Sequence, residues 1–79
     1  MNNKKLDNIL YIDDEEANLL VFKTVFWQKY NIFEATNTQQ AYTILKHNNI
    51  KVVITDQRMP NETGLSFIER VHNEFNQIV

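Results

Sequence analysis

Three short apolar runs, each followed by a segment with helical periodicity, constrain the fold of this chain more than any other feature. The predicted strands are the runs 9–12, 32–35 and 51–56. The predicted helices are the segments 16–30, 38–48 and 65–76. The first run is continuously apolar, and the third is nearly so from Val52 to Ile54, which is typical of parallel strands covered on both faces. The order β-α-β-α-β-α therefore predicts an α/β domain with a parallel sheet, right-handed crossovers and helices on both sides.

Apolar spacing within the predicted helices indicates which faces are buried. In the first helix we expect a stripe of Leu19, Phe22 and Phe26, with Trp27 at the margin of the core. We expect three further residues to widen this stripe: Leu20, Val21 and Val25. The second helix begins after a Thr-Asn-Thr segment, and we predict Thr38 as its N-cap.

Size and composition exclude several classes of protein. With 79 residues the chain forms one small domain, and a net charge of −2 argues against a nucleic-acid-binding segment. The longest apolar run, 19–22, is too short to cross a membrane. Residues 1–7 are predicted to be a polar tail without signal-peptide character. The absence of cysteine excludes disulfides and thiolate metal sites and fits a reducing, cytoplasmic compartment.

Carboxylates follow two of the predicted strands, and these are the candidate site residues. Asp13 and Asp14 come after the first strand, and Asp56 comes after the third. An aspartate at a strand end is commonly a turn former or a helix cap, so the joint pattern carries the argument. In a parallel sheet, ligands bind beyond the carboxyl ends of the strands. If the first and third strands are neighbours, the three acids converge, and Mg²⁺ is the cation that would neutralise them.

The segments 9–15 and 52–64 resemble the receiver domain of bacterial two-component response regulators, and the resemblance covers the chain from residue 8 onward. It implies a flavodoxin-like sheet with strand order 2-1-3. It implies that Asp56 accepts a phosphoryl group from a sensor histidine kinase. Asp14 would be a direct Mg²⁺ ligand, Asp13 would bind the metal through water, and Arg58 would contribute its backbone carbonyl. Gly64 would let the loop after Asp56 turn into the third helix.

The family pattern continues for two more strands, which end in a Ser or Thr and in a Lys that contact the phosphoryl group. We therefore expect residues 8–79 to be three βα units of an incomplete receiver domain. The third strand should then be an exposed edge, and the third helix should expose Phe67, Ile68 or Val71. Such surfaces favour a homodimer formed through this strand and helix.

Two other functional classes are compatible with parts of this pattern. One is a receiver-like interaction module that binds partners or dimerises without phosphorylation. The other is a phosphatase of the haloacid dehalogenase type, which uses an aspartate after a parallel strand and a second acid two residues later. Here that second position is Arg58, which disfavours the phosphatase. Because a kinase would supply the phosphoryl group, we expect a signalling domain and not an enzyme, without membrane or nucleic-acid binding.

Overall fold

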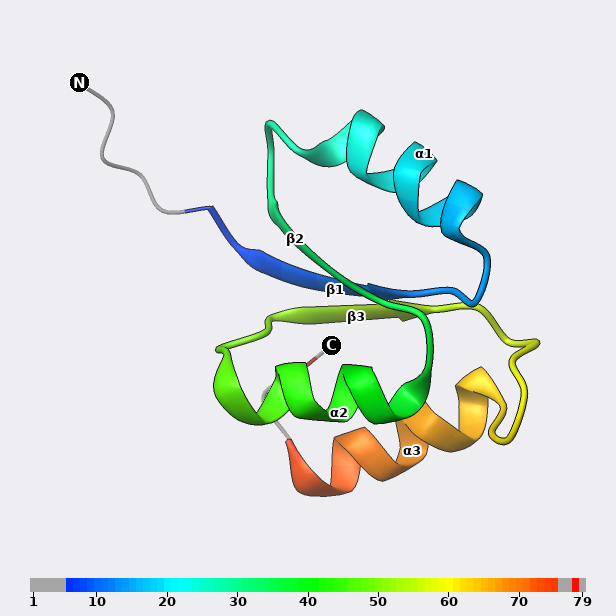
Figure 1. Cartoon of the computed structure of the whole chain (residues 1–79). Helices are drawn as coiled ribbons and strands as arrows, with labels where there is room; N and C mark the ends of the chain where they lie inside the picture. Colours follow the sequence, from blue (N-terminus) through cyan, green and yellow to red (C-terminus); the bar gives the residue numbers. More distant parts are fainter. Residues whose placement is uncertain (1–5, 76–77, 79) are drawn as a thin grey trace.

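The predicted order of three strands and three helices is confirmed. The computed structural model describes residues 6–75 and 78, so residues 1–5 of the predicted tail and residue 76, the predicted end of the third helix, lie outside the described part. The elements are β1 (Asn8–Ile12), α1 (Glu16–Phe26), β2 (Asn31–Ala35), α2 (Thr38–His47), β3 (Val52–Thr55) and α3 (Gly64–Glu74) (Figure 1).

The strands form one parallel sheet in the order β2-β1-β3, as expected. The central strand β1 is paired on both sides: Ile9 lies opposite Ile32 of β2 and Val52 of β3. This register places the ends of β1 and β3 side by side, with Ile12 opposite Thr55. The acids that follow these two strands therefore begin from adjacent positions.

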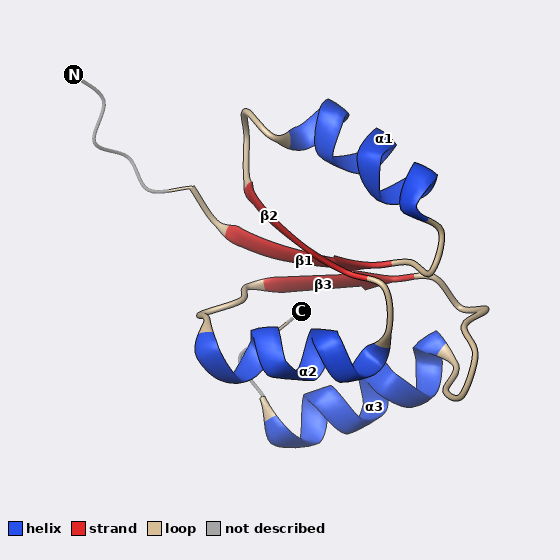
Figure 2. Cartoon of the chain, in the orientation of Figure 1, coloured by secondary structure: helices blue, strands red, loops and turns tan. Residues whose placement is uncertain are grey.

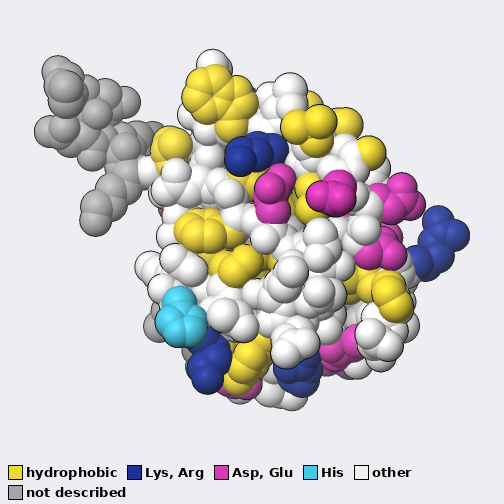
Figure 3. All heavy atoms as spheres, viewed as in Figure 1, with side chains coloured by type: hydrophobic (Ala, Val, Ile, Leu, Met, Phe, Trp, Pro, Cys, Tyr) yellow, Lys and Arg dark blue, Asp and Glu magenta, His cyan; other side chains and the backbone are white. Residues whose placement is uncertain are grey.

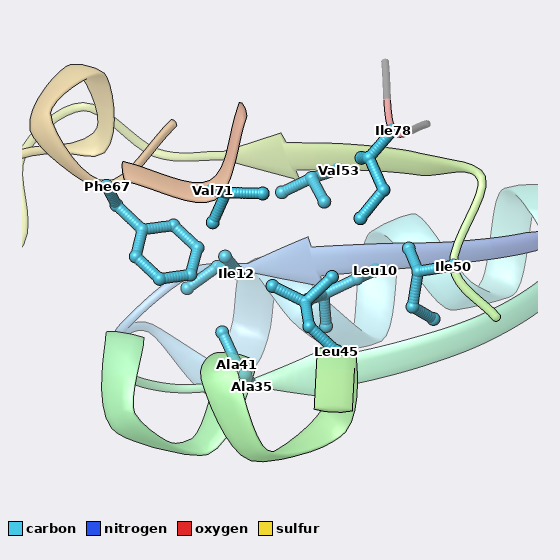
Figure 4. Packing of buried hydrophobic residues seen from close by; sticks show 10 residues of the cluster. All are labelled: Leu10, Ile12, Ala35, Ala41, Leu45, Ile50, Val53, Phe67, Val71 and Ile78. Atoms are coloured by element: carbon cyan, nitrogen blue, oxygen red, sulfur yellow. The ribbon is translucent and has the colours of Figure 1, made fainter. Parts of the chain in front are cut away.

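Helices cover both faces of the sheet: α1 lies on one face, and α2 and α3 lie on the other (Figure 2). The main core lies between the sheet and the two helices α2 and α3 (Figure 4). Its residues come from all three strands, from α2 and α3, and from two positions outside the helices and strands (Figure 4): Leu10, Ile12, Ala35, Ala41, Leu45, Ile50, Val53, Phe67, Val71 and Ile78.

The α1 face carries a narrower apolar contact than the sequence indicates. Leu19 is buried, and Tyr11 of β1 stacks on Phe22 with ring centroids 4.3 Å apart. The expected widening of the stripe is wrong, because Leu20, Val21 and Val25 are 62–66% exposed. Trp27, expected at the margin of the core, is 58% exposed. The helix ends at Phe26, and the side chains of Leu20, Val21 and Val25 lie on its exposed sides. Apolar side chains are accordingly visible on the α1 side of the surface (Figure 3).

The expected exposure of α3 is also wrong at two positions. Phe67 and Val71 are 0% and 1% exposed, because they lie one turn apart on the helix face that packs into the main core. The Arg70 guanidinium lies over the Phe67 ring, 5.1 Å from its centroid. Ile68 is only partly buried. The predicted exposed edge is confirmed for the described part of the chain, where β3 pairs with β1 alone and Ile54 is 37% exposed.

Side-chain caps fix the starts of the two helices on this face. Asn37, and not the predicted Thr38, caps α2, because its side-chain oxygen accepts a hydrogen bond from the N–H of Gln40. Thr63 caps α3 in the same way by accepting from the N–H of Ser66. Across residues 6–75 and 78, no helix combines the length and apolar character that crossing a membrane requires.

Candidate functional site

The three predicted acids converge at the carboxyl end of the sheet. Strand pairing continues one residue beyond β3, because the Asp56 N–H donates to the Ile12 carbonyl at 3.0 Å. On the other side, the Asp13 N–H donates to the Ala35 carbonyl at 3.0 Å. As a result, one carboxylate oxygen from each of Asp13, Asp14 and Asp56 lies within 4.8 Å of the others. Acidic side chains are visible at this end of the molecule, at the right of Figure 3.

Asp13 is the most enclosed of the three acids, with only 3% of its surface exposed. Its carboxylate accepts three hydrogen bonds, each 3.0 Å long: from the Tyr11 hydroxyl and the Asn18 side-chain amide on Oδ2, and from the Glu15 N–H on Oδ1. These donors offset the cost of burying a charged carboxylate. Burial, together with the hydrogen bond to Asp13, raises the pKa of the Tyr11 hydroxyl above its usual value, which is already well above neutral pH.

The other two acids are more accessible. Asp14 is exposed, and Asp56 is partly buried. The N–H of Arg58 donates to Asp56 Oδ1 at 3.4 Å, which places the Arg58 backbone beside this carboxylate. Asp56 thus combines a backbone anchored to β1 with a side chain that reaches the open end of the sheet. This is the geometry required of a side chain that meets a ligand from solvent.

The loop from Asp56 to α3 is held by hydrogen bonds to Gln57. The Gly64 N–H donates to the Gln57 carbonyl at 3.1 Å, and the Leu65 N–H donates to Gln57 Oε1 at 2.9 Å. Glu62 in this loop forms a salt bridge with Arg70 of α3 at 2.9 Å. The hydrogen bond from Arg70 lowers the pKa of Glu62 and keeps this carboxylate charged. These contacts tie the start of the loop at Gln57 to the beginning of α3, and they tie Glu62 in the loop to Arg70 within α3.

Gly64 lets the loop turn into α3, as the resemblance implies, by leaving space and not by adopting a left-handed conformation. The left-handed residue of the loop is Asn61, with φ 75°, and Gly64 does not have a positive φ. Instead, a Cβ atom at Gly64 would lie 2.6 Å from the Asp56 carbonyl oxygen and 3.1 Å from the Gln57 Cα. The absence of a side chain lets α3 begin directly against the backbone of Asp56.

The charge and chemistry of the acidic cluster fit a hard divalent cation. Two negative charges at 4.8 Å, the upper limit of the separations between these oxygens, repel by about 3.5 kcal/mol at an effective dielectric near 20, and by less where a group is exposed, as Asp14 is. Among the described residues, none of the three acids forms an ion pair with a basic side chain. Oxygen ligands of this kind, with room for water on the exposed side, are what Mg²⁺ prefers.

The predicted convergence of the three acids is confirmed, but the residues that hold Asp13 were not predicted from the sequence. Tyr11 precedes Asp13 by two positions, and Asp13 continues the extended chain beyond β1, so the two side chains lie on the same face of the sheet. That periodicity was a usable signal for Tyr11. Asn18 comes from α1, and only the packing of α1 on the sheet brings it to Asp13.

Comparison with known proteins gives one consistent family. The family model described as the response regulator receiver domain matches residues 9–79. The hydrogenase transcriptional regulatory protein HoxA of Bradyrhizobium diazoefficiens is 32% identical over 63 residues, which are 80% of this chain and 13% of that protein. HoxA of Cupriavidus necator is matched over 16% of its length, so this chain spans less than a fifth of these curated relatives.

Solved structures show the same fold. A response regulator receiver domain protein from Clostridium thermocellum superimposes with a TM-score of 0.85 at 27% identity, covering 94% of this chain and 61% of that one. The response regulator TrrA from Thermotoga maritima, solved in complex with Mg²⁺-BeF, gives a TM-score of 0.83 at 26% identity, covering 90% and 63%. These likenesses confirm the flavodoxin-like receiver fold.

Proposed function

Because this chain belongs to the response regulator receiver domain family, we propose that it accepts a phosphoryl group from a sensor histidine kinase in two-component signalling. The observation that carries the proposal is the convergence of Asp13, Asp14 and Asp56 where β1 and β3 end. An acidic cluster alone is also found at solvated helix starts. Family membership is therefore the reason for assigning a function to this convergence. We assign Asp56 as the phosphoacceptor, since it follows the strand next to the central one and remains accessible.

In the proposed reaction, a carboxylate oxygen of Asp56 attacks the phosphorus of the kinase phosphohistidine. The new P–O bond forms as the P–N bond breaks, and the histidine nitrogen keeps the electron pair and takes up a proton. Phosphoryl transfer depends mainly on an aligned nucleophile and on neutralised charge. The alignment would come from the hydrogen bond of the Asp56 N–H to the Ile12 carbonyl and from the Arg58 N–H, which donates to Asp56 Oδ1.

We propose that Asp14, Asp56 and the Arg58 backbone carbonyl would hold Mg²⁺ directly, and that Asp13 would hold it through water. When bound, Mg²⁺ supplies charge neutralisation for the carboxylates and for the transferring phosphoryl oxygens. The Mg²⁺-BeF complex of TrrA supports this assignment by likeness of fold. The enclosure of Asp13 supports an indirect role for it, because three donors already occupy its oxygens.

The kinase supplies the phosphoryl group in this proposal, so we regard the chain as a phosphoacceptor domain and not as an enzyme. A histidine kinase acts on its receiver inside the cell, and we propose a cytoplasmic location on that basis. The lack of cysteine agrees with such a location.

An additional role in self-association is favoured by one observation. Within the described residues, β3 has a free edge, and Ile54 on this strand is 37% exposed. A free edge of this kind can pair with a strand of another chain. We propose that two copies associate through β3. Phe67 and Val71 take no part in this contact, because they are buried in the core.

The functional proposal is tested by binding of beryllofluoride, a phosphoryl mimic, followed by NMR with and without Mg²⁺. We expect Mg²⁺-dependent shifts in the wild-type chain around residues 13–14 and 56–64, and none in Asp56→Asn. Asp7→Asn is the matched control, because it makes the same chemical change at the opposite end of β1, where Asp7 is exposed. Equal responses of Asp56→Asn and the wild type, or no response of the wild type, would contradict the proposal.

A further inference from the structure

We propose that Tyr11 and Asn18 are positioning residues that orient the Asp13 carboxylate toward the metal site. This inference rests on the proposed function, because it concerns how Mg²⁺ is held. The two side chains come from different elements, β1 and α1, and both donate to the same oxygen of Asp13 at 3.0 Å. Together they tie the carboxylate to the strand on one side and to the helix on the other.

Counting the acceptor directions of Asp13 shows what this arrangement leaves free. A carboxylate has about four lone-pair directions, two on each oxygen. Tyr11 and Asn18 occupy both directions on Oδ2, and the Glu15 N–H occupies one on Oδ1. A single direction on Oδ1 therefore remains for a metal ion or for a water bound to it. Asp13 can contribute to the site only while the hydrogen bonds on Oδ2 keep it in this orientation.

The position of Tyr11 is itself fixed by packing. Its ring stacks on Phe22 with an interplanar angle of 17°, and its backbone lies in the central strand between Glu34 of β2 and Ile54 of β3. The hydroxyl thus has little freedom to follow a moving carboxylate. A rigid donor of this kind fixes the orientation of the ligand group to which it is hydrogen-bonded, as the hydrogen-bond partners of metal ligands do in other proteins.

The alternative is that these hydrogen bonds only make burial of Asp13 tolerable, which would affect stability alone. Direct metal binding separates the two roles. Mg²⁺ affinity of the full chain is measured by titration calorimetry and NMR for the wild type, Tyr11→Phe and Asn18→Ala. Tyr42→Phe is the matched control: it also removes a tyrosine hydroxyl bonded to a carboxylate, that of Glu74, but between α2 and α3.

We expect Tyr11→Phe and Asn18→Ala each to weaken Mg²⁺ binding about tenfold or more, as losses of outer-shell partners commonly do. Tyr42→Phe should bind Mg²⁺ like the wild type. In the metal-free protein, Tyr11→Phe should also shift the side-chain amide resonances of Asn18, because both groups share one oxygen of Asp13. Asn18 is exposed, so its alanine variant keeps the test decisive if Tyr11→Phe does not fold.

Wild-type affinity in folded Tyr11→Phe or Asn18→Ala would overturn the positioning role and leave the proposed metal site standing. A wild-type chain whose Mg²⁺ binding is absent, or is unchanged in Asp14→Ala, would overturn the metal site itself and the positioning role with it. Equal weakening by Tyr42→Phe would show that the effect comes from general loss of structure, which also overturns the inference.

Discussion

At Gly64, one missing side chain determines how closely α3 approaches the phosphoacceptor candidate. A Cβ atom there would lie 2.6 Å from the Asp56 carbonyl oxygen, and neither backbone has room to move without shifting β3 or α3. We predict that Gly64→Ala lowers the free energy of unfolding by about 1–3 kcal/mol, a typical cost of overpacking. Urea unfolding measures this change.

Leu65→Ala serves as the control for this substitution, because Leu65 is the next residue of the same helix and is 61% exposed. We expect it to change the free energy of unfolding by less than about 0.5 kcal/mol. A Gly64→Ala variant as stable as Leu65→Ala would show that the close approach at Asp56 is relieved at no cost.

Asp13, Asp14 and Asp56 could be selected from the sequence as candidate site residues, because they come directly after apolar runs. The roles of Tyr11 and Gly64 could not be predicted as fully. A glycine in a loop suggests conformational freedom, yet here Asn61 adopts the left-handed conformation and Gly64 provides space. The two explanations differ only in backbone geometry, which a single sequence does not contain.

At the scale of elements, the start of α2 depends on one side chain. Asn37 accepts a hydrogen bond from the Gln40 N–H at 2.8 Å, and Gln40 Oε1 accepts from the Thr36 N–H at 2.9 Å. We predict that Asn37→Ala lowers the free energy of unfolding by about 1 kcal/mol, the usual cost of losing an N-cap. Thr38→Ala should cost less, since alanine is the better helix former at the first helical position. Denaturant titration of both variants measures these losses. A larger loss of unfolding free energy for Thr38→Ala than for Asn37→Ala would identify Thr38 as the cap.

The limits of the helices were harder to predict than their existence. Both Asn37 and Thr38 are good cap residues, and the residue whose backbone leaves the helix conformation decides between them. The apolar residues of the segment 19–27 extend beyond the buried stripe, because Leu20, Val21 and Val25 remain exposed on α1. The hydrophobicity of a helix residue alone does not show whether its side chain packs on the sheet or lies exposed next to the packed stripe.

For the molecule as a whole, alternation of strands and helices was enough to predict the topology, and the resemblance to receivers gave the strand order. Burial on the α3 side was not predicted correctly. Phe67 and Val71 were expected at the surface, but they meet Ile12, Ala41 and their neighbours in one core (Figure 4). That core is built from residues of all three strands and two helices. Which side chains are buried in it therefore depends on tertiary packing, which the pattern of α3 alone does not show.

The free edge of β3 leads to a prediction about assembly. We expect the purified chain to form a dimer whose population rises with protein concentration, because paired edges satisfy backbone groups of both copies. Light scattering over a concentration series measures this. Ile54→Lys, which places a charge on the exposed position of β3, should shift the equilibrium to the monomer, whereas Val25→Lys on α1 should not. A wild-type chain that stays monomeric throughout would contradict the proposed self-association.

The most direct test of the phosphoacceptor role of Asp56 is chemical phosphorylation. The chain is incubated with acetyl phosphate and Mg²⁺, and the product is analysed by intact mass spectrometry and by mapping of the modified residue. We predict addition of one phosphoryl group on Asp56, its loss in Asp56→Asn, and its loss when Mg²⁺ is removed by chelation. Unchanged labelling of Asp56→Asn, or modification of the wild type at a different residue, would contradict the assignment.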